Sequence, residues 1–244
     1  MRKLTTVILM SLAATGAYGD DQSPHKFGGD VAITSDYVFR GISNSDNKPA
    51  VQGDVTYEYT PLGIYASLWA SSIDFAPAND DPIETDWTAG IGGSFFNTGL
   101  SYDLGNVYYY YPGNANKSHG NYDYDEVYFG LSYDFANVAY APSVAGKVYY
   151  SPDFFGETGD AYYIDGSVGF SLPYEVSLNT HVGYQYIDNN GGPSTEYVDW
   201  KVGLSKEVFG FGLDVSYTAV DDQASVCGST LCGDKVIFTI SRGF

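Results

Sequence analysis

Apolar and polar residues alternate through the C-terminal segment of the chain. Val236, Phe238 and Ile240 occupy one set of alternate positions, and small or polar residues occupy most of the other set. A period of two predicts a strand with one apolar face. Arg242 interrupts that face, where its long side chain can extend to a membrane surface. A last strand that ends on an aromatic residue, here Phe244, is typical of bacterial outer-membrane barrels, although an ordinary amphipathic strand is the alternative.

The same alternation recurs along most of the chain. Val51 and Val55, for example, share one face of a segment whose other face carries Gln52, Asp54 and other polar residues. The pattern predicts about twelve strands, and ten or fourteen are also compatible with it. The predicted strands cover residues 30–42, 50–60, 62–73, 85–96, 98–111, 125–135, 137–150, 161–172, 174–187, 196–207, 210–220 and 235–244.

Short and long connections alternate between these strands. The short turns lie at 60–63, 97–99, 135–137, 172–174 and 209–210, and the longer polar loops at 43–49, 74–85, 112–122, 151–160, 188–195 and 221–233. This asymmetry is typical of an all-β, transmembrane antiparallel β-barrel with short periplasmic turns and long extracellular loops. A soluble sandwich or barrel also alternates. Aromatic residues near the predicted strand ends favour the membrane barrel, because amphipathic rings prefer the interfacial zone.

The N-terminal segment predicts export. Arg2 and Lys3 precede a short apolar run, and small residues lead up to Asp20, so residues 1–19 are predicted to be a cleaved signal peptide. Residues 20–244 are then a single barrel domain, because no linker-like segment divides them. No later run approaches the roughly 20 apolar residues that a spanning helix needs.

Composition narrows the class of partner. The chain has 24 Tyr and 29 Gly, and its formal net charge is −19, which becomes −21 once Arg2 and Lys3 are removed. Such acidity, without clustered Lys and Arg, excludes nucleic acid as a partner. The mean hydropathy of −0.17 is compatible with a membrane barrel, because only alternate side chains of its strands face lipid.

A family resemblance rests on residues 35–53. The segment from Ser35 to Ser43 reads SDYVFRGIS, and Pro49-Ala50-Val51-Gln52-Gly53 follows it. It resembles the N-terminal signature of the TorF family of porin-like proteobacterial proteins, long catalogued as conserved hypotheticals. The resemblance implies an outer-membrane barrel with a pore, and it implies little about the solute.

Charged residues on the inward faces are candidates for the lining of the interior. Arg40 is too far along the strand from Asp36 for a direct pair, at about 13 Å, and Asp54 or Glu58 on the next strand is its predicted partner. A structural ion pair and a selective constriction are both compatible with this arrangement. The candidates are Asp36, Arg40, Asp54, Glu58, Glu126, Lys147, Asp165, Lys201 and Asp214, with Asp30, Asp86, Asp103, Asp134 and Asp199 as further inward acids. A net acidic interior predicts cation preference.

The loops carry two further signals. Cys227 and Cys232 are the only cysteines, and in an exported chain they predict a disulfide, although redox chemistry is possible. Acidic residues gather at Asp74, Asp80, Asp81 and Glu84, and again at Asp153, Glu157 and Asp160. Solvated loops are the favoured reading, since no calcium-loop spacing is present, so no metal site or cofactor is predicted. The alternative is that Ca²⁺ or Mg²⁺ bridges these loops to anionic lipopolysaccharide.

The sequence therefore predicts an outer-membrane porin for small solutes or ions. The alternative is a barrel filled by its own side chains, with a structural or surface-binding role. An enzyme is the third reading, because only His181 with Ser177 or Asn179 suggests a catalytic group. Expected partners are outer-membrane lipid and lipopolysaccharide, and the barrel-assembly machinery through Phe244. The sequence predicts neither a solute nor an oligomeric state.

Overall fold

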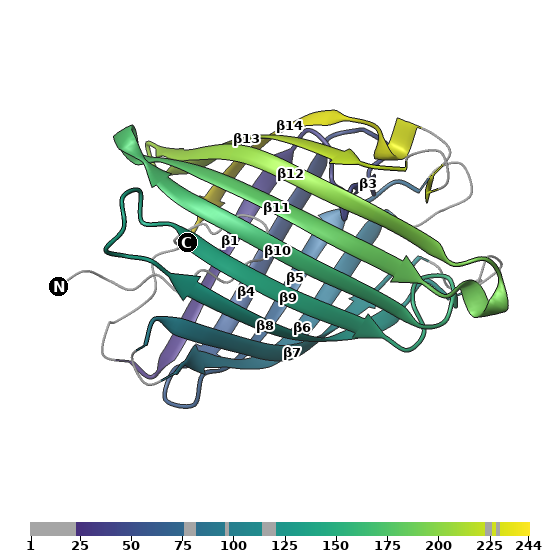
Figure 1. Ribbon diagram of the computed structural model, residues 1–244, viewed down its shortest axis with the longest axis horizontal. Helices are drawn as coiled ribbons and strands as arrows, with labels where there is room; N and C mark the ends of the chain where they lie inside the picture. Colours follow the sequence, from purple (N-terminus) through teal and green to yellow (C-terminus); the bar gives the residue numbers. More distant parts are fainter. Residues whose placement is uncertain (1–22, 76–81, 96–97, 114–120, 223–225, 228–229) are drawn as a thin grey trace.

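The computed structural model describes residues 23–75, 82–95, 98–113, 121–222, 226–227 and 230–244. Twelve antiparallel strands close into a barrel in which each strand pairs with its neighbours along the chain, and β1 pairs with β14 (Figure 1). The barrel strands are β1 His25–Thr34, β4 Ala50–Tyr59, β5 Ile64–Ser72, β6 Ile83–Ser94, β7 Leu100–Tyr110, β8 Tyr124–Asp134, β9 Ser143–Ser151, β10 Ala161–Leu172, β11 Val176–Ile187, β12 Thr195–Val208, β13 Phe211–Val220 and β14 Lys235–Gly243. The predicted fold class and strand number are confirmed. The predicted signal peptide lies outside the described residues.

The closing pair brings the two ends of the described chain together. The backbone N–H of Phe244 donates to the carbonyl of Gly29 at 3.0 Å, next to the ladder that pairs Asp30 with Gly243. The first predicted strand, 30–42, was wrong at both ends. β1 begins at His25 and stops at Thr34, because the chain then turns away from the sheet.

The outer surface of the barrel is apolar. Along each strand the outward positions hold large exposed apolar side chains, such as Phe27, Val55 and Phe238, of which Phe27 is 62 % and Phe238 60 % exposed. A soluble protein would bury such a continuous band, whereas lipid covers it in an outer-membrane barrel. Within the described part of the chain, no helix has the length and apolarity needed to cross a bilayer.

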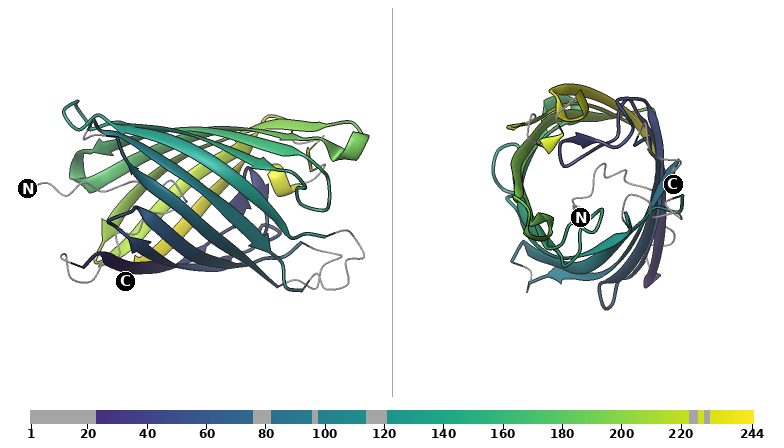
Figure 2. Two further views of the ribbon diagram at one scale, coloured as in Figure 1. Left: turned by 90° about the horizontal axis from the view of Figure 1, so that it is seen from below. Right: turned by 90° about the vertical axis from the view of Figure 1, so that its right-hand side faces the viewer.

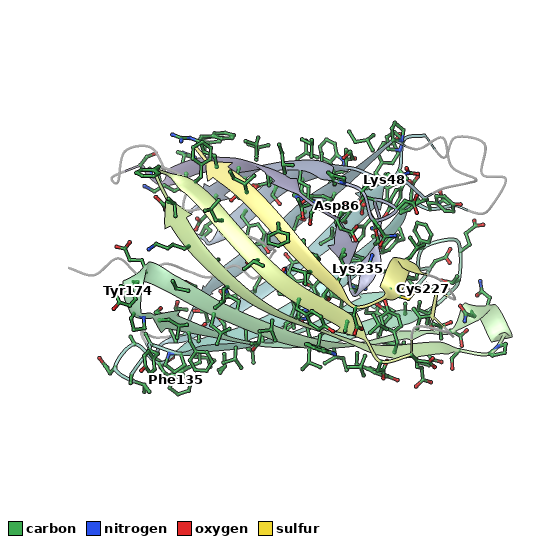
Figure 3. All side chains as sticks on the ribbon, turned by 90° about the horizontal axis from the view of Figure 1, so that it is seen from above. Lys48, Asp86, Phe135, Tyr174, Cys227 and Lys235 are labelled. Atoms are coloured by element: carbon green, nitrogen blue, oxygen red, sulfur yellow. A yellow bond between two sulfur atoms is a disulfide. The ribbon has the colours of Figure 1, made fainter. Side chains whose placement is uncertain are left out.

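The two ends of the barrel differ, as the loop lengths predict. One end holds Phe244 and the tight connections, including the 3-10 turn η1 Pro173–Glu175, and the other holds the longer connections with η2 Asn189–Gly191 and η3 Thr230–Cys232 (Figures 1 and 2). In Figure 3, Phe135 and Tyr174 lie at the turn end, whereas Lys48, Asp86, Lys235 and Cys227 lie toward the loop end. In outer-membrane barrels generally, short turns face the periplasm and long loops face the cell exterior.

One connection enters the barrel. Residues 35–49, which join β1 to β4, fold back inside the ring of strands as an inner hairpin, visible in the axial view of Figure 2. It contains two short strands, β2 Val38–Phe39 and β3 Ile42–Ser43, which pair only with each other. The inner hairpin therefore occupies the barrel interior near its loop end without belonging to the barrel sheet.

Candidate functional site

The inner hairpin turns at Arg40 and Gly41. Both residues have positive φ, at 47° and 80°, as a two-residue turn between tightly paired strands requires. A Cβ on Gly41 would lie 2.3 Å from Val220 Cγ2 and 2.9 Å from Asp199 Cβ. Glycine thus serves twice here, since it adopts the left-handed conformation and lets the backbone approach the barrel wall closely.

Asp36 organises the base of the inner hairpin. Its Oδ1 accepts hydrogen bonds from the hydroxyls of Ser43, at 2.5 Å, and Ser45, at 3.0 Å. Its Oδ2 accepts from Lys235 Nζ on β14 at 2.8 Å. Lys235 also contacts the side chain of Asn47. One carboxylate thereby joins both arms of the hairpin to the barrel wall, with nearly all of its surface buried.

Aromatic side chains pack the inner hairpin against the wall. Tyr37 meets Trp69 of β5 edge to face at a centroid separation of 5.2 Å, and Phe39 meets Tyr109 of β7 at 5.8 Å. On the opposite side, Ile42 packs against a small buried cluster that includes Val220. The hairpin therefore spans from the β5–β7 wall to the β12–β13 wall.

Arg40 lies at the tip of this span, in a cage of barrel side chains. Its Nη2 donates to Glu126 Oε2 at 2.6 Å and its Nη1 to Glu126 Oε1 at 2.9 Å, a bidentate pair. Nη1 also donates to Gln185 Oε1 at 2.9 Å. The guanidinium carbon lies 4.1 Å from the ring centroid of Tyr163 and 5.1 Å from that of Tyr149. Phe39 completes the cage at 4.7 Å.

The predicted partner of Arg40 was wrong. Asp54 and Glu58 were expected because they lie on the next strand, but the turn carries Arg40 across the interior to Glu126 on β8. Glu126 was itself a candidate for the interior, and the structure brings the two residues together. Gln185 was missed, because a single Gln in a polar face carries no sequence signal.

The acceptors of the cage are held by other bonds. Gln185 Nε2 donates to the backbone carbonyls of Tyr162 and Tyr186, both at 3.2 Å, so that its oxygen faces Arg40. Tyr109 donates its hydroxyl to Glu126 Oε2 at 3.1 Å. Glu126 and Gln185 are each only 1 % exposed. Their positions are therefore fixed by the barrel rather than by the guanidinium alone.

Tyr163 reaches across a neighbouring strand. Its hydroxyl donates to Asp199 Oδ1 at 2.9 Å, two strands away on β12. A Cβ on Gly183 of β11 would lie 2.0 Å from this hydroxyl, so the absence of a side chain there gives the ring its path. Asp199 Oδ2 also lies 3.3 Å from His181 Nε2. The ring that stacks on Arg40 is thus fixed at its far end.

Two further buried carboxylates lie beside the inner hairpin on β6. Glu84 accepts a hydrogen bond from the hydroxyl of Tyr111 at 2.9 Å and is 1 % exposed. Asp86, between Trp69 and Tyr109 in the strand register, is 7 % exposed, and its Oδ1 has no hydrogen-bond partner among the described residues. Glu84 was expected in an acidic loop, and the structure places it inside the barrel because β6 begins at Ile83.

A second polar network lies in the interior across β5 to β9. Lys147 Nζ pairs with Asp103 Oδ2 at 2.7 Å and lies 4.3 Å from the ring centroid of Tyr128. Asp103 also accepts from the hydroxyl of Tyr65 at 2.5 Å. Across β10 to β12, His181 Nδ1 contacts Asp165 Oδ2 at 2.7 Å. The contacts of the His181 ring are therefore with two carboxylates, those of Asp165 and Asp199, and not with the predicted Ser177 or Asn179.

The remaining candidates also face the interior in this register. Asp54 lies opposite Asp30, and Glu58 lies opposite Lys26 of β1. Lys201 lies beside His181, and Asp214 lies opposite Ser205 and Thr239. The sequence missed Lys26 and Lys235 as inward cations, because their strands were predicted to start after them or at their edge.

The loop end carries an exposed ion pair and the disulfide. Hydrogen bonds to Asp74, at 2.7 Å, and to Asp46 raise the pKa of the exposed Lys48 ammonium. Cys227 and Cys232 form the predicted disulfide. Asp80 and Asp81 of the predicted acidic loop lie outside the described residues, and the described residues contain no cluster of three or more His, Cys, Asp or Glu arranged to hold a metal ion.

Comparison with known proteins places the fold. A model for a bacterial protein family of unknown function matches residues 18–244, and no curated protein matches the sequence. The KdgM porin, solved in complex with disordered oligogalacturonate, is similar with a TM-score of 0.55 and 11 % identity over 89 % of this chain and 98 % of that one. The COG4313 outer membrane channel from Pseudomonas putida F1 gives 0.48 and 14 %, over 89 % and 95 %. OmpT of Vibrio cholerae gives 0.46 and 9 %, over 91 % and 98 %.

Proposed function

The chain belongs to the Gcw_chp family, and we propose that its barrel is a narrow outer-membrane channel that passes small solutes with a preference for cations. The fold is that of outer-membrane porins, which favours a channel over an enzyme. The observation that carries the proposal is the carboxylate-rich inner face, arranged in a closed barrel around the inner hairpin. The resemblance of residues 35–53 to the TorF signature agrees with a pore.

The charge of the interior supports cation preference. The barrel strands direct many carboxylates inward, and fewer cations lie beside them. Three of these cations, Arg40, Lys147 and Lys235, each form an ion pair with a carboxylate. Rings of Asp and Glu side chains favour cations over anions in pores. The inward acids are Asp30, Asp54, Glu58, Glu84, Asp86, Asp103, Glu126, Asp134, Asp165, Asp199, Glu207 and Asp214.

The inner hairpin sets the width of the proposed path. Twelve strands enclose more space than an eight-stranded barrel, whose side chains fill it, and less than a sixteen-stranded porin. Tyr37 and Phe39 project from the hairpin onto β5 and β7, and Arg40 reaches Glu126 on β8. Ile42 packs on the other side of the interior, against the cluster that includes Val220. The same contacts favour the second candidate function, a closed barrel with a structural or surface-binding role.

The test is the current through the mature chain, residues 20–244, refolded into a planar bilayer under a KCl gradient. Discrete steps with a reversal potential of cation-selective sign are expected. Anion-selective steps would support a channel but contradict the proposed cation preference of its acidic lining. A folded barrel without steps would favour the second candidate.

The cellular setting forms part of the proposal. Residues 1–19 direct export, and the terminal Phe244, paired with β1 at Gly29, is the element that the barrel-assembly machinery engages. Outer-membrane lipid covers the apolar band, and lipopolysaccharide lies around the acidic loop end.

A further inference from the structure

The cage around Arg40 is built almost entirely from the barrel. Glu126, Tyr149, Tyr163 and Gln185 come from the four consecutive strands β8 to β11, and only Phe39 comes from the inner hairpin. Three of these barrel side chains have bonds of their own: Glu126 with Tyr109, Tyr163 with Asp199, and Gln185 with a backbone carbonyl. Most of the cage is therefore held by contacts other than those with Arg40.

The chemistry of the cage is specific for a guanidinium group. Two carboxylate oxygens of Glu126 accept in parallel, and the amide oxygen of Gln185 accepts a third bond. The ring of Tyr163 lies against the guanidinium at 4.1 Å. A planar cation with forked donors uses all of these features, whereas a compact ammonium uses the charge alone.

The inner hairpin can leave this cage without breaking the barrel. β2 and β3 pair only with each other. β1 and β4 pair along their full length up to Thr34 and Ala50, where the hairpin starts and ends. Departure of the turn and of β2 and β3 would thus break none of the strand pairs of the barrel, while Ser35 keeps its backbone bond to Phe238 of β14 at 2.8 Å.

We propose that the Arg40 cage is a binding site for small solutes that carry a guanidinium group, and that Arg40 is a tethered occupant which such a solute replaces. The inference rests on the proposed function in one respect, that the ligand enters as a channel solute. Binding at the cage opens the path, because it breaks the bidentate Arg40–Glu126 pair that holds the tip of the inner hairpin.

The surroundings favour an organic cation at this level of the barrel. Asp86 lies in the strand register between Trp69 and Tyr109, the residues that Tyr37 and Phe39 contact. One of its buried carboxylate oxygens has no hydrogen-bond partner among the described residues. Asp199 adds a second carboxylate beside Tyr163. A hard divalent ion needs about six oxygen ligands, and the described carboxylates form no such group. Aromatic faces and dispersed carboxylates suit a weakly hydrated planar cation.

The first experiment removes the tethered occupant. Arg40→Ala lacks the part of the side chain that ethylguanidinium replaces, so this probe should bind the refolded variant in detergent, measured by calorimetry. The control is Arg40→Ala combined with Glu126→Gln, which keeps the cage volume and removes its charge. Arg40→Ala should bind ethylguanidinium about ten- to hundredfold more tightly than the double variant, because the double variant lacks the charge-assisted hydrogen bonds of Glu126. Equal affinity for the two variants would overturn the proposal.

The second experiment uses the wild-type chain in a bilayer. It tests the proposal even if Arg40→Ala does not refold, with or without ethylguanidinium. Ethylguanidinium on the loop side should lengthen the open time in proportion to its occupancy. Tetramethylammonium, which has charge without donors, should not. In a wild-type chain that conducts, identical effects of the two cations, or no effect of either, would overturn the proposal.

The two proposals fail in different ways. If ethylguanidinium binds Arg40→Ala but the wild-type chain does not conduct, the cage stands as a binding site and the channel proposal fails. Conductance that ethylguanidinium does not alter, with no binding to Arg40→Ala, would leave the channel and remove the cage as a ligand site.

Discussion

Arg40 is a buried cation whose charge is balanced by one carboxylate. Glu126 is 1 % exposed, and its two oxygens form the bidentate pair at 2.6 and 2.9 Å. A buried ion pair adds little stability compared with apolar residues of the same shape. Removal of one partner is costly, because it leaves the other charge buried without a counter-charge. The pair therefore makes the position of the inner hairpin sensitive to either residue.

Glu126→Gln should lower the free energy of unfolding by about 3–5 kcal/mol, because Arg40 then remains buried without a counter-charge. Urea unfolding in detergent micelles measures the change. Asp74→Asn is the matched control, since it removes the carboxylate from the exposed pair with Lys48 and should cost less than about 1 kcal/mol. Equal losses of unfolding free energy for the two substitutions would show that the buried Arg40–Glu126 pair contributes no more to stability than the exposed pair.

Gly41 allows a separate test of how the turn fits the wall. Gly41→Ala should cost about 1–3 kcal/mol of backbone strain and, in addition, clash with Val220, whose Cγ2 lies 2.3 Å from the new Cβ. Gly156→Ala has a similar φ of +75° with nothing within 4 Å, so it reports the strain alone. The unfolding free energy should fall further for Gly41→Ala. A difference within error would mean that the hairpin is not seated against Val220.

The inward direction of Arg40 and Glu126 could be predicted from alternation, but their pairing could not. Alternation gives the face of a strand and the order of neighbours, so it ranks Asp54 and Glu58 first as partners. Arg40 reaches Glu126 because Gly41 reverses the chain at that point. The turn consists of Arg40 and Gly41, and Gly41 is the one residue of the two whose type suggests a turn. A single glycine in a strand-like run is equally compatible with a bulge in a continuous strand.

At the scale of elements, the barrel strands follow from the period of two. Each is long enough for several alternations, and the apolar set must face lipid, so the register is strongly specified. The inner hairpin escapes this reasoning because β2 and β3 have two residues each. The sequence predicts a strand over 30–42 and a polar loop over 43–49, and it gives no sign that Asp36 bonds with Ser43 and Ser45 across a hairpin.

The disulfide loop supports the inner hairpin from the β13 side. Cys227 and Cys232 pack with Val220 in the cluster that Ile42 contacts. Reduction by dithiothreitol should lower the unfolding free energy by about 2 kcal/mol, the entropy that so short a loop returns to the unfolded chain. Urea unfolding with and without the reductant measures it. The Cys227→Ser, Cys232→Ser double variant should not respond, and an equal response would attribute the effect to the reductant.

At the scale of the whole molecule, excess negative charge is concentrated where a solute would pass. Asp54 and Glu58 lie on the inner face of β4, away from the Arg40 cage. Asp54→Asn combined with Glu58→Gln should shift the reversal potential toward zero in a KCl gradient, because two fixed charges leave the path. Asp74→Asn at the loop end should shift it less. An unchanged reversal potential in the double variant would place the selective region elsewhere.

The most direct measurement of the whole account is the single-channel conductance of a variant whose inner hairpin, residues 36–48, is replaced by a short glycine-serine turn. β1 and β4 already meet at Thr34 and Ala50, so the barrel should still close, which heat-modified gel mobility can verify. The account predicts larger and more frequent cation-selective steps than in the wild-type chain, since the hairpin no longer crosses the interior. A folded variant with the same conductance as the wild type, or with none, would contradict it.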